Sequence, residues 1–597
     1  MNLNNIERFA KKARNELKEQ VRGRLRYVLE RDTAELRGLA KPIEELRKRI
    51  QISSEEEVVE EVAYTWFNRL AALRMLDALD VHPFRMRVLM PKEGMTQPEI
   101  FQQARQGIFP EELKDFDQTR FNDLLQGRLP HPNPQQAAYR MLLVAVCNYW
   151  HSAMGFLFEP LADYTELLLP EDLLTPTSVA EGFRTEISDE DCEDIEIIGW
   201  LYQFYISEKK DEVIGKVVKS EDIPAATQLF TPNWIVKYMV QNSLGAQWLA
   251  TYPQSPLKGQ MEYYIEPAEQ TDEVNAQLAA ITPSQLNPEE LTLIDPASGS
   301  GHILVEAYEL FKAIYLERGY RQRDVPQLIL EKNLFGLDID ERAAQLTGFA
   351  LMMKGRADDR RLFERGVKLN VMALVDSAGF DAEGLAKGVE LSDYDLRPGD
   401  LTELKGLFEH ATTFGSLIQV PEGLAAKLPA LKQLSEATSQ DLFVSEALKR
   451  LGPLVQQAEL LAAQYDAVVA NPPYMGSKYQ VPTLKRFAKN NFPDSKSDLF
   501  TCFIERGYSL AKSYGFNSMV TMQSWMFLSS FQPMRERLLT DKTIVTMAHL
   551  GARAFGSISG EIVQTTSVVL RNQPPRGYRP VFLRLLSGGE EEKRSTL

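Results

Sequence analysis

The feature that most constrains the fold is a short apolar run that leads through an acidic residue and a glycine-rich turn into a helical segment. Residues 291–294 read LTLI, and the motif DPASGSG follows at residues 295–301. Because Gly299 and Gly301 have no Cβ atom, the backbone can turn sharply there and a ligand can lie directly against it. The helix that follows presents free amide groups to such a ligand. The segment therefore predicts a strand, a turn and a helix with nucleotide-binding geometry.

The same alternation of apolar runs with helical stretches continues through the second half of the chain. Helical stretches are predicted at residues 305–316 and 343–353, and further strands at residues 333–337, 467–470, 518–522 and 566–570. Strands that alternate with helices indicate a parallel sheet covered by helices. We therefore expect an α/β fold class, with a Rossmann-like doubly wound domain over residues 221–597. No strand is evident at about residues 377–460, which we expect to be a helical insertion.

Residues 1–220 are predicted to form an all-helical N-terminal domain. Apolar residues recur every three or four positions in the first 28 residues, with arginines and lysines between them, which is typical of an amphipathic helix with a basic face. Further helical stretches at residues 55–79 and 136–150 are separated by proline-rich breaks. The basic face of the first helix either contacts nucleic acid or is an ordinary solvated surface, and the sequence leaves both open.

The distribution of charge decides where a polyanion could bind. The 597 residues include 67 Lys plus Arg and 83 Asp plus Glu, a net charge of −16 that at first argues against a nucleic-acid partner. The basic residues are segregated, however. Residues 1–50 hold 14 basic and 8 acidic side chains, and residues 475–512 hold 7 basic and 3 acidic ones. A nucleic acid is therefore expected at these basic segments.

The composition also indicates the cellular setting. No apolar run approaches the ~20 residues of a membrane span, and the polar first residues lack the apolar core of a signal peptide. The three cysteines, Cys147, Cys192 and Cys502, have no metal-ligand spacing and do not suggest a disulfide framework. We expect a cytoplasmic protein that involves neither a membrane nor a metal.

Carboxylates end two of the predicted strands. Asp295 would repel a pyrophosphate but suits a cationic or amine-bearing ligand, and the motif lacks the third glycine of the dinucleotide fingerprint, which points away from NAD. Asp338 and Asp340 end the run NLFGLDID, where a carboxylate can accept hydrogen bonds from ribose hydroxyls. The alternative is that these two aspartates cap the next helix.

The most specific motif is NPPY at residues 471–474, directly after the predicted strand at residues 467–470. Two prolines cannot continue a central strand, so they hold the chain in a stiff loop beyond the sheet edge. The Asn471 side-chain oxygen and the Pro472 carbonyl could both accept from one exocyclic NH2 group, while Tyr474 offers a flat face to a planar ring. The motif thus predicts a site for an amino group on an aromatic base. The alternative is a simple Asn-Pro turn.

With these motifs, the chain resembles the amino-group DNA methyltransferases that use S-adenosylmethionine, over roughly residues 227–572. QLFTP at residues 228–232, the DPASGSG loop, SDLF at residues 497–500 and residues 514–524 follow the family's motif order. The segment IGWLYQFY at residues 198–205 and FGSLI at residues 414–418 are similar to the PglX-type adenine-specific methyltransferases of BREX phage-defence systems.

The resemblance implies a site-specific N6-adenine methyltransferase that marks host double-stranded DNA as self, with other defence-system proteins as partners. Its cofactor would be S-adenosyl-L-methionine. The implied catalytic loop is Asn471, Pro472, Pro473 and Tyr474. The implied cofactor-binding residues are Phe230, Thr231, Asp295, Ala297, Gly299, Gly301, Asp338 and Asp376. The adenine-ring ligand is the least clear assignment, since Asp400 is an alternative to Asp376.

Three other expectations follow. A target-recognition domain is not apparent, so sequence reading would depend on another chain or on a longer form of this one. Residues 588–594 are expected to be a solvated tail. Rival functions are methylation of a protein glutamine or an RNA base, the modification subunit of a restriction-modification system, and a cofactor-binding DNA-recognition subunit that is inactive alone.

Overall fold

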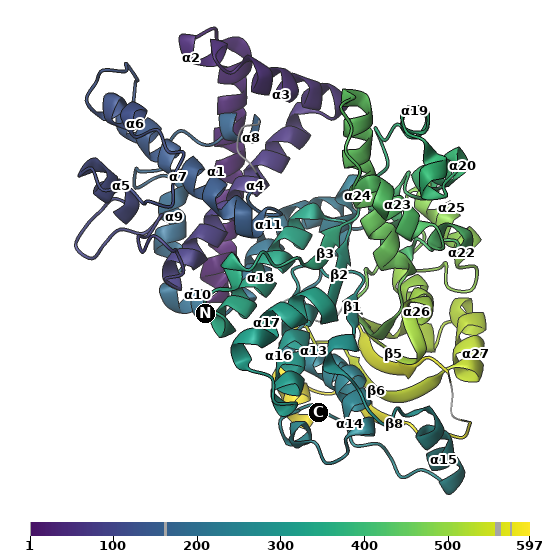
Figure 1. Ribbon diagram of the computed structural model, residues 1–597. Coiled ribbons are helices and arrows are strands. Elements are labelled where there is room, and N and C mark those ends of the chain that lie inside the picture. The colour runs from purple at the N-terminus through teal and green to yellow at the C-terminus, as the bar shows by residue number, and fades with distance from the viewer. Residues whose placement is uncertain (1, 160–163, 556–562, 574–575) are drawn as a thin grey trace. The chain divides into compact units, whose positions relative to one another are not determined.

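The computed structural model describes residues 2–159, 164–555, 563–573 and 576–597 (Figure 1). The chain divides into two compact units. The first comprises residues 1–208 with the short stretches 348–353 and 363–366, and the second comprises the remaining residues from 209 to 597. Among the described residues, no helix combines the length and the apolar character needed to cross a membrane.

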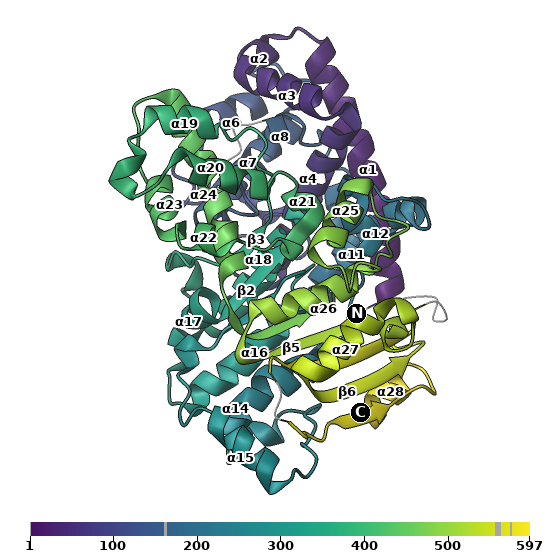
Figure 2. The same ribbon diagram turned by 90° about the vertical axis from the view of Figure 1, so that its right-hand side faces the viewer.

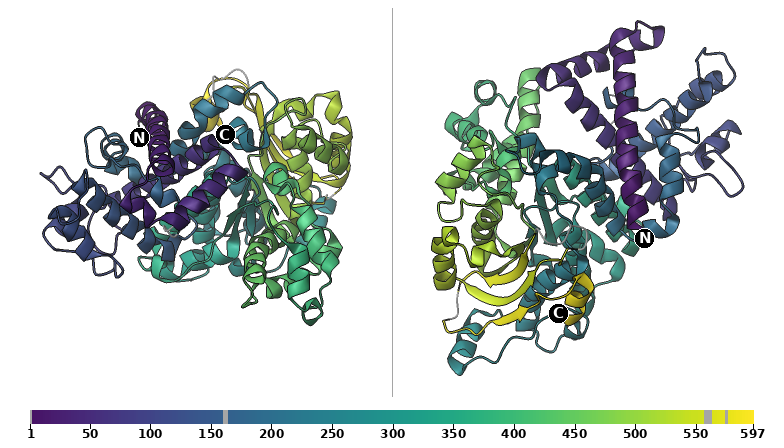
Figure 3. Two further views of the ribbon diagram at one scale, coloured as in Figure 1. Left: turned by 90° about the horizontal axis from the view of Figure 1, so that it is seen from above. Right: turned by 180° about the vertical axis from the view of Figure 1, so that it is seen from behind.

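The part of the first unit before residue 209 is built of helices, as predicted. The long helix α1 is uninterrupted (Figure 3) and packs against α4. Its apolar stripe, which includes Ile6, Leu17 and Leu25, is buried. The longer helices of this region are α1 (Leu3–Glu30), α3 (Ala40–Ile52), α4 (Glu55–Ala78), α5 (Glu99–Arg105), α6 (Gln118–Leu125), α7 (Pro134–Met154), α9 (Val179–Glu186) and α11 (Glu196–Val213).

Acidic residues of the same unit neutralise much of the basic face of α1. Arg14 forms an ion pair with Glu60, and Lys18 with Glu56 and Glu60, and both acids lie in the first turns of α4. Arg24, further along α1, pairs with Glu171. These contacts favour the second interpretation of this helix, an ordinary protein surface, over a nucleic-acid contact.

The second unit is organised around a sheet of eight strands in the order β3-β2-β1-β4-β5-β7-β6-β8. The strands β3, β2, β1, β4 and β5 run parallel, β7 is antiparallel to both β5 and β6, and β8 is parallel to β6. Their bounds are β1 (Leu293–Asp295), β2 (Leu334–Asp338), β3 (Asn370–Ala373), β4 (Tyr465–Ala470), β5 (Ala511–Met522), β6 (Thr543–Gly551), β7 (Thr565–Arg571) and β8 (Val581–Arg584).

Helices cover both faces of this sheet, which confirms the doubly wound α/β prediction. On one face α13 packs on β5 and β7, and α16 packs on β1 and β2. On the other face α26 packs on β4 and β5 and α27 packs on β6, as Figure 2 shows beside β5 and β6. Every residue of β4 is buried, as expected for a central parallel strand. The covering helices are α13 (Asn233–Val240), α16 (His302–Glu317), α26 (Leu499–Leu510) and α27 (Gln532–Asp541).

The chain between β3 and β4 forms helices, in line with the sequence. Their apolar side chains join the sheet face that α26 covers in one buried cluster, which includes Ile294, Leu401, Leu451 and Val468. The helices of this insertion are α19 (Ala382–Gly388), α20 (Pro398–Leu407), α21 (Ala411–Phe414), α22 (Glu422–Ala425), α23 (Leu428–Ser435) and α24 (Leu442–Ala462).

The expectation of a solvated tail at residues 588–594 is wrong. This segment forms most of α28 (Glu590–Thr596). Lys593 is buried, and its ammonium group donates hydrogen bonds to the carbonyl oxygens of Leu550 and Leu585, at 2.6 and 2.5 Å. Because unpaired carbonyls are costly to bury, this lysine stabilises the last turn of the chain against the end of β6 and the residue after β8.

Candidate active site

The predicted site residues come together at the carboxyl ends of neighbouring parallel strands. Leu293 of β1 pairs with Leu334 of β2 on one side and with Ala467 of β4 on the other. Asp295, Asp338 and Asn471 therefore end or directly follow three adjacent strands. The crevice between β1 and β4, where the order of the strands reverses direction, is the usual ligand position in such sheets.

The glycine loop is held by the side chains of two neighbouring elements. The backbone N–H of Gly299 donates to Asp338 Oδ2 at 2.8 Å, and Thr347 Oγ1 donates to the Gly299 carbonyl at 2.8 Å. Gly299 and Gly301 have φ values of +53° and +89°. A Cβ atom on Gly301 would meet Thr347 Cγ2 at 2.9 Å, so glycine is required there by both backbone conformation and space.

The two carboxylates beside this loop are less acidic than ordinary aspartates. Asp295 is buried and accepts a hydrogen bond from the Ala297 N–H at 3.0 Å. Burial raises the pKa of Asp295 to about 8, and the nearby Asp338 carboxylate contributes to the increase. Burial likewise raises the pKa of Asp338 to about 6, although N–H donors from Asp340 and Gly299 oppose it. A cationic or amine-bearing ligand would restore the charged form of Asp295.

The amide of Asn471 is fixed in one orientation by the segment that contains QLFTP. Its Nδ2 donates to Thr231 Oγ1 at 2.9 Å and to the Leu229 carbonyl at 3.3 Å. Since a carbonyl oxygen only accepts, the contact with Leu229 identifies the nitrogen side of the amide. Asn471 Oδ1 is buried and has no hydrogen-bond partner among the described residues. A buried acceptor without a partner is costly, so this oxygen is suited to receive a donor from a ligand.

The rest of the NPPY loop is anchored to β5 and to the start of α26. The Tyr474 hydroxyl donates to the Val520 carbonyl at 3.1 Å, and its ring meets that of Phe500 edge-on, with centroids 5.8 Å apart. Pro472 is buried and Pro473 is half-buried. Directly after the loop, the Met475 N–H donates to Asp498 Oδ1 at 2.9 Å. The loop is thus rigid on both sides of its prolines.

The remaining predicted residues have clear positions. Phe230 packs edge-on against the ring of His302, with centroids 3.8 Å apart, next to the glycine loop. Asp376 follows β3, and both of its carboxylate oxygens accept from Thr412, one from the N–H at 2.8 Å and one from the hydroxyl at 2.9 Å. The alternative candidate, Asp400, accepts from the Arg397 N–H at the start of α20. The role of Asp376 toward an adenine ring therefore stays a prediction.

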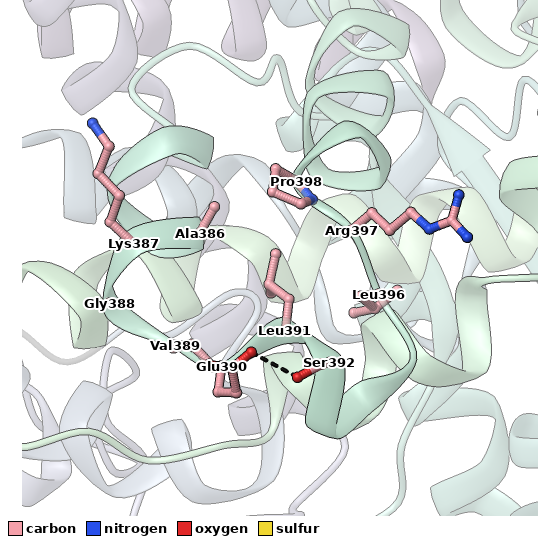
Figure 4. A pocket seen from close by; sticks show the side chains of 10 residues that line it. All are labelled: Ala386, Lys387, Gly388, Val389, Glu390, Leu391, Ser392, Leu396, Arg397 and Pro398. Carbon is pink, nitrogen blue, oxygen red and sulfur yellow. Dashed lines mark hydrogen bonds between the residues drawn. The ribbon is translucent and has the colours of Figure 1, made fainter.

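A separate cavity of about 380 Å³ lies in the insertion, between the end of α19 and the start of α20 (Figure 4). The charged side chains of Lys387 and Arg397 extend away from each other there. Among the lining side chains drawn, Ser392 donates to Glu390 at 2.6 Å. Because its polar groups do not converge on one point, we place the functional site at the sheet edge instead.

Comparisons with known proteins find similar methyltransferases. Residues 332–555 match the Eco57I restriction-modification methylase family. The whole chain is 49% identical over 643 aligned positions to the adenine-specific methyltransferase BrxX of Escherichia coli O9:H4 (strain HS), covering 53% of that protein. The chain is also 36% identical to the adenine-specific methyltransferase PglX of Lacticaseibacillus casei (strain Zhang). That alignment covers 99% of this chain and 49% of that protein. Over its whole length the chain is therefore similar to the adenine-specific methyltransferases BrxX and PglX.

The chain spans about half the length of the two BrxX/PglX relatives that it matches. A solved structure of the Type IIL restriction-modification enzyme MmeI in complex with DNA is similar over 98% of this chain and 60% of that one. The sequence identity of that pair is 14% and the TM-score is 0.47.

The structure adds positioning residues that the sequence did not identify. Ser416, in the FGSLI segment, donates to the Pro296 carbonyl of the glycine loop at 2.6 Å, and its own carbonyl accepts from Arg506 Nε at 2.8 Å. Thr347 and Asp498 hold the glycine loop and the NPPY loop as described above. Their only sequence signal is membership of segments that resemble the family, because the contacts join residues far apart in the chain.

Proposed function

We propose that this chain is the methyl-transfer part of a DNA adenine N6-methyltransferase that marks host DNA in a BREX-type defence system, with other defence proteins as partners. The observation that carries the proposal is the buried, unpartnered Oδ1 of Asn471, held in one orientation at the carboxyl edge of the sheet. No donor from the described part of the chain reaches this atom, and an exocyclic amino group would supply one. The similarity to two proteins described as adenine-specific methyltransferases supports adenine as the base.

The residues present fit S-adenosyl-L-methionine as the cofactor. The buried Asp295 suits an amine-bearing ligand, and two glycines with positive φ leave the backbone of the loop open to close approach. Buried Ser298 Oγ lies in the same loop without a hydrogen-bond partner among the described residues. Asp338 has lone pairs left for ribose hydroxyls after accepting from two backbone amides. When bound, the cofactor supplies an activated methyl group on a sulfonium centre.

The chain's own residues make the amine reactive and hold it in place. The lone pair of an aromatic amine is delocalised, so the enzyme has to favour its localised form. Asn471 Oδ1 and the Pro472 carbonyl accept the two N–H hydrogens and stabilise the positive charge that develops on nitrogen. The stiff prolines fix both acceptors, and most of the remaining barrier is lowered by alignment of the reacting atoms. No strong base is required.

The adenine has to leave the duplex stack to reach this loop, which costs about a few kcal/mol. Stacking on an aromatic side chain offsets part of that cost, typically by about 1–3 kcal/mol per base. Tyr474 is the aromatic residue that the NPPY loop offers, and its hydroxyl is tied to β5. A fixed ring stacks at a lower entropic cost than a mobile one.

The proposal is tested by incubating the chain with methyl-labelled S-adenosylmethionine and host DNA, alone, with a longer form of the protein, and with its defence-system partners. Transfer to DNA in at least one of these conditions supports the proposal. Transfer to protein or RNA but not to DNA would favour the rival substrates. Cofactor binding without transfer in any condition would favour a recognition subunit and would refute the proposal.

The raised pKa of Asp295 predicts a pH dependence of cofactor binding. A cationic amine stabilises the charged form of the Asp295 carboxylate. Binding of the cofactor therefore lowers the pKa of Asp295 from about 8, and at a pH below about 8 the carboxyl group releases a proton on binding. We expect affinity to rise with pH between about 6 and 7.5, by up to about tenfold per unit. Calorimetry in buffers of different ionisation enthalpy measures the released proton. In Asp295→Asn the release should disappear, and proton uptake by the unmodified chain would contradict the assignment.

Thr231 is predicted to orient the catalytic amide in addition to its implied contact with the cofactor. Thr231→Val removes the acceptor that Asn471 Nδ2 uses at 2.9 Å, while Thr231→Ser retains it. A hydrogen bond of this kind contributes about 0.5–1.5 kcal/mol, so the single-turnover rate at saturating cofactor should fall by up to about tenfold in the valine variant alone. Weaker cofactor binding with an unchanged rate would show that Thr231 serves the cofactor only.

A further inference from the structure

We propose that a basic surface beside the NPPY loop binds the phosphate backbone of the DNA that carries the target base, an inference that rests on the proposed function. This surface, called here the α25 basic surface, consists of the exposed face of α25 (Pro482–Asn491) and of the loops on either side of it. Its cations are Lys478, Lys485, Arg486, Lys489 and Lys496, and all five are exposed.

These five cations have no acidic partner within the described residues, although they lie close together in the sequence. The two acidic residues of the same segment, residues 475–498, are committed elsewhere. Asp494 forms an ion pair with Arg537 at 3.3 Å, and Asp498 accepts from the backbone N–H of Met475. The segment therefore presents five positive charges and no available negative one. Mutual repulsion among like charges destabilises such a cluster unless a polyanion or counterions neutralise it.

The contrast with α1 supports a ligand rather than an ordinary solvated face. Both segments are rich in lysine and arginine, but the cations of α1 meet acids of their own unit, as in Lys18 with Glu56 and Glu60. Elsewhere in the second unit, three exposed lysines are paired as well: Lys258 with Glu266, Lys332 with Glu289, and Lys432 with Glu459. The α25 basic surface differs from these in having kept its charges available.

The surface is rigid, so it can hold a backbone in a defined place. Leu484 and Ala488 bury the inner face of α25, and the ring of Phe487 stacks on Phe414 of α21, with centroids 4.0 Å apart and planes within 13°. Pro482 occupies the first turn, where it is pre-organised for a helix. Lysines 485 and 489 lie one turn apart on the same side of the helix. A fixed row of cations matches the regular spacing of phosphates better than a mobile tail does.

The surface is also directly connected to the catalytic loop. Three residues separate Tyr474 from Lys478, and hydrogen bonds keep this connection compact. The N–H of Tyr479 donates to the Gly476 carbonyl, and the N–H of Ser477 donates to the Ser497 carbonyl, both at 2.9 Å. A base held at Asn471 remains attached to its sugar and phosphates, which must leave the site nearby. Cations beside the loop would neutralise those phosphates and oppose return of the base to the stack.

The test is the salt dependence of duplex DNA binding by the full chain and by a triple variant, Lys485→Gln, Arg486→Gln and Lys489→Gln. Each phosphate contact contributes about 0.9 to the slope of log affinity against log salt concentration. The triple variant should therefore bind with a slope shallower by about two to three and with lower affinity at low salt. The matched control, Lys258→Gln with Lys332→Gln and Lys432→Gln, removes the same charge from paired positions and should change the slope by less than about 0.5.

The thermal unfolding and the cofactor affinity of each variant are measured as well. Values equal to those of the unmodified chain establish that the substitutions act only locally. The proposal would be overturned if the triple variant and the unmodified chain had equal slopes. It would also be overturned if the triple variant and its control lost the same amount of DNA affinity. Stronger competition by polyglutamate than by DNA of the same charge would assign the surface to an acidic protein instead and would also overturn it. DNA binding that depends on the surface, in a chain that transfers no methyl group, would refute the proposed function while leaving this inference intact.

Discussion

Asn471→Ala is expected to abolish methyl transfer and to leave cofactor affinity nearly unchanged. The substitution removes the buried Oδ1 that would accept from the amine, together with the Nδ2 contacts to Thr231 and Leu229. Removal of one group that stabilises developing charge costs about a hundredfold to a thousandfold in rate in comparable active sites. We expect at least the upper end of that range, because the same amide also aligns the base. Single-turnover transfer at saturating cofactor measures the effect.

A matched control for this variant is Asn491→Ala. Because Asn491 lies on the α25 basic surface, a second control, Asn275→Ala, is added: Asn275 is an exposed residue of the same unit away from that surface, and its side chain donates to the Gln270 carbonyl. Its replacement should leave the rate of transfer within about twofold, as surface substitutions usually change little. A large loss of cofactor affinity in Asn471→Ala, or transfer at the unmodified rate, would contradict the role given to this amide.

Gly301→Ala is expected to cause the largest loss of cofactor binding of any single methyl addition in the chain. A non-glycine residue at φ +89° costs about 1–2 kcal/mol. The new Cβ would also lie 2.9 Å from Thr347 Cγ2 and 3.1 Å from Thr347 Cα, so the loop has to move. Together these effects predict a fall in cofactor affinity of at least about thirtyfold, since every 1.4 kcal/mol is tenfold. Equilibrium binding of the cofactor measures it.

Gly319→Ala separates a local effect on the glycine loop from a general loss of stability. Gly319 follows the other end of the same helix, α16, and has a nearly equal φ of +83°, but a Cβ atom there meets nothing within 4 Å. This variant carries the backbone cost without the steric one and lies away from the loop, so its cofactor affinity should stay close to that of the unmodified chain. Similar losses in both variants would indicate general destabilisation and would remove the support for close approach at Gly301.

The sequence sufficed to predict the parts of the fold where local and global signals agree. The strands before Asp295, Asp338 and Asn471 are short apolar runs that end in turn-forming residues, so their type and their ends are readable. Since carboxyl ends of parallel strands share one sheet edge, the meeting of these three residues followed from the topology. The helical insertion was predictable for the same reason, because it lacks such runs.

Other features depend on long-range contacts and left no clear pattern. The strands β6 and β8 were not predicted, since their burial alternates irregularly and they pair at the far side of the sheet. The fixed orientation of the Asn471 amide depends on Leu229 and Thr231, about 240 residues earlier in the chain. The buried role of Lys593 is similar, because a lysine in an acidic segment ordinarily indicates a solvated surface.

The most direct test of the central claim is the chemical identity of the methylated base. Host DNA treated with the protein and with isotope-labelled S-adenosylmethionine is digested to nucleosides, and the labelled nucleoside is identified by mass spectrometry, with the Asn471→Ala variant as the blank. We predict label in N6-methyl-2′-deoxyadenosine alone, and none in the blank. Label on the C5 position of cytosine would contradict an amine-accepting site at Asn471. The same amount of label with the Asn471→Ala variant as with the unmodified protein would contradict it as well.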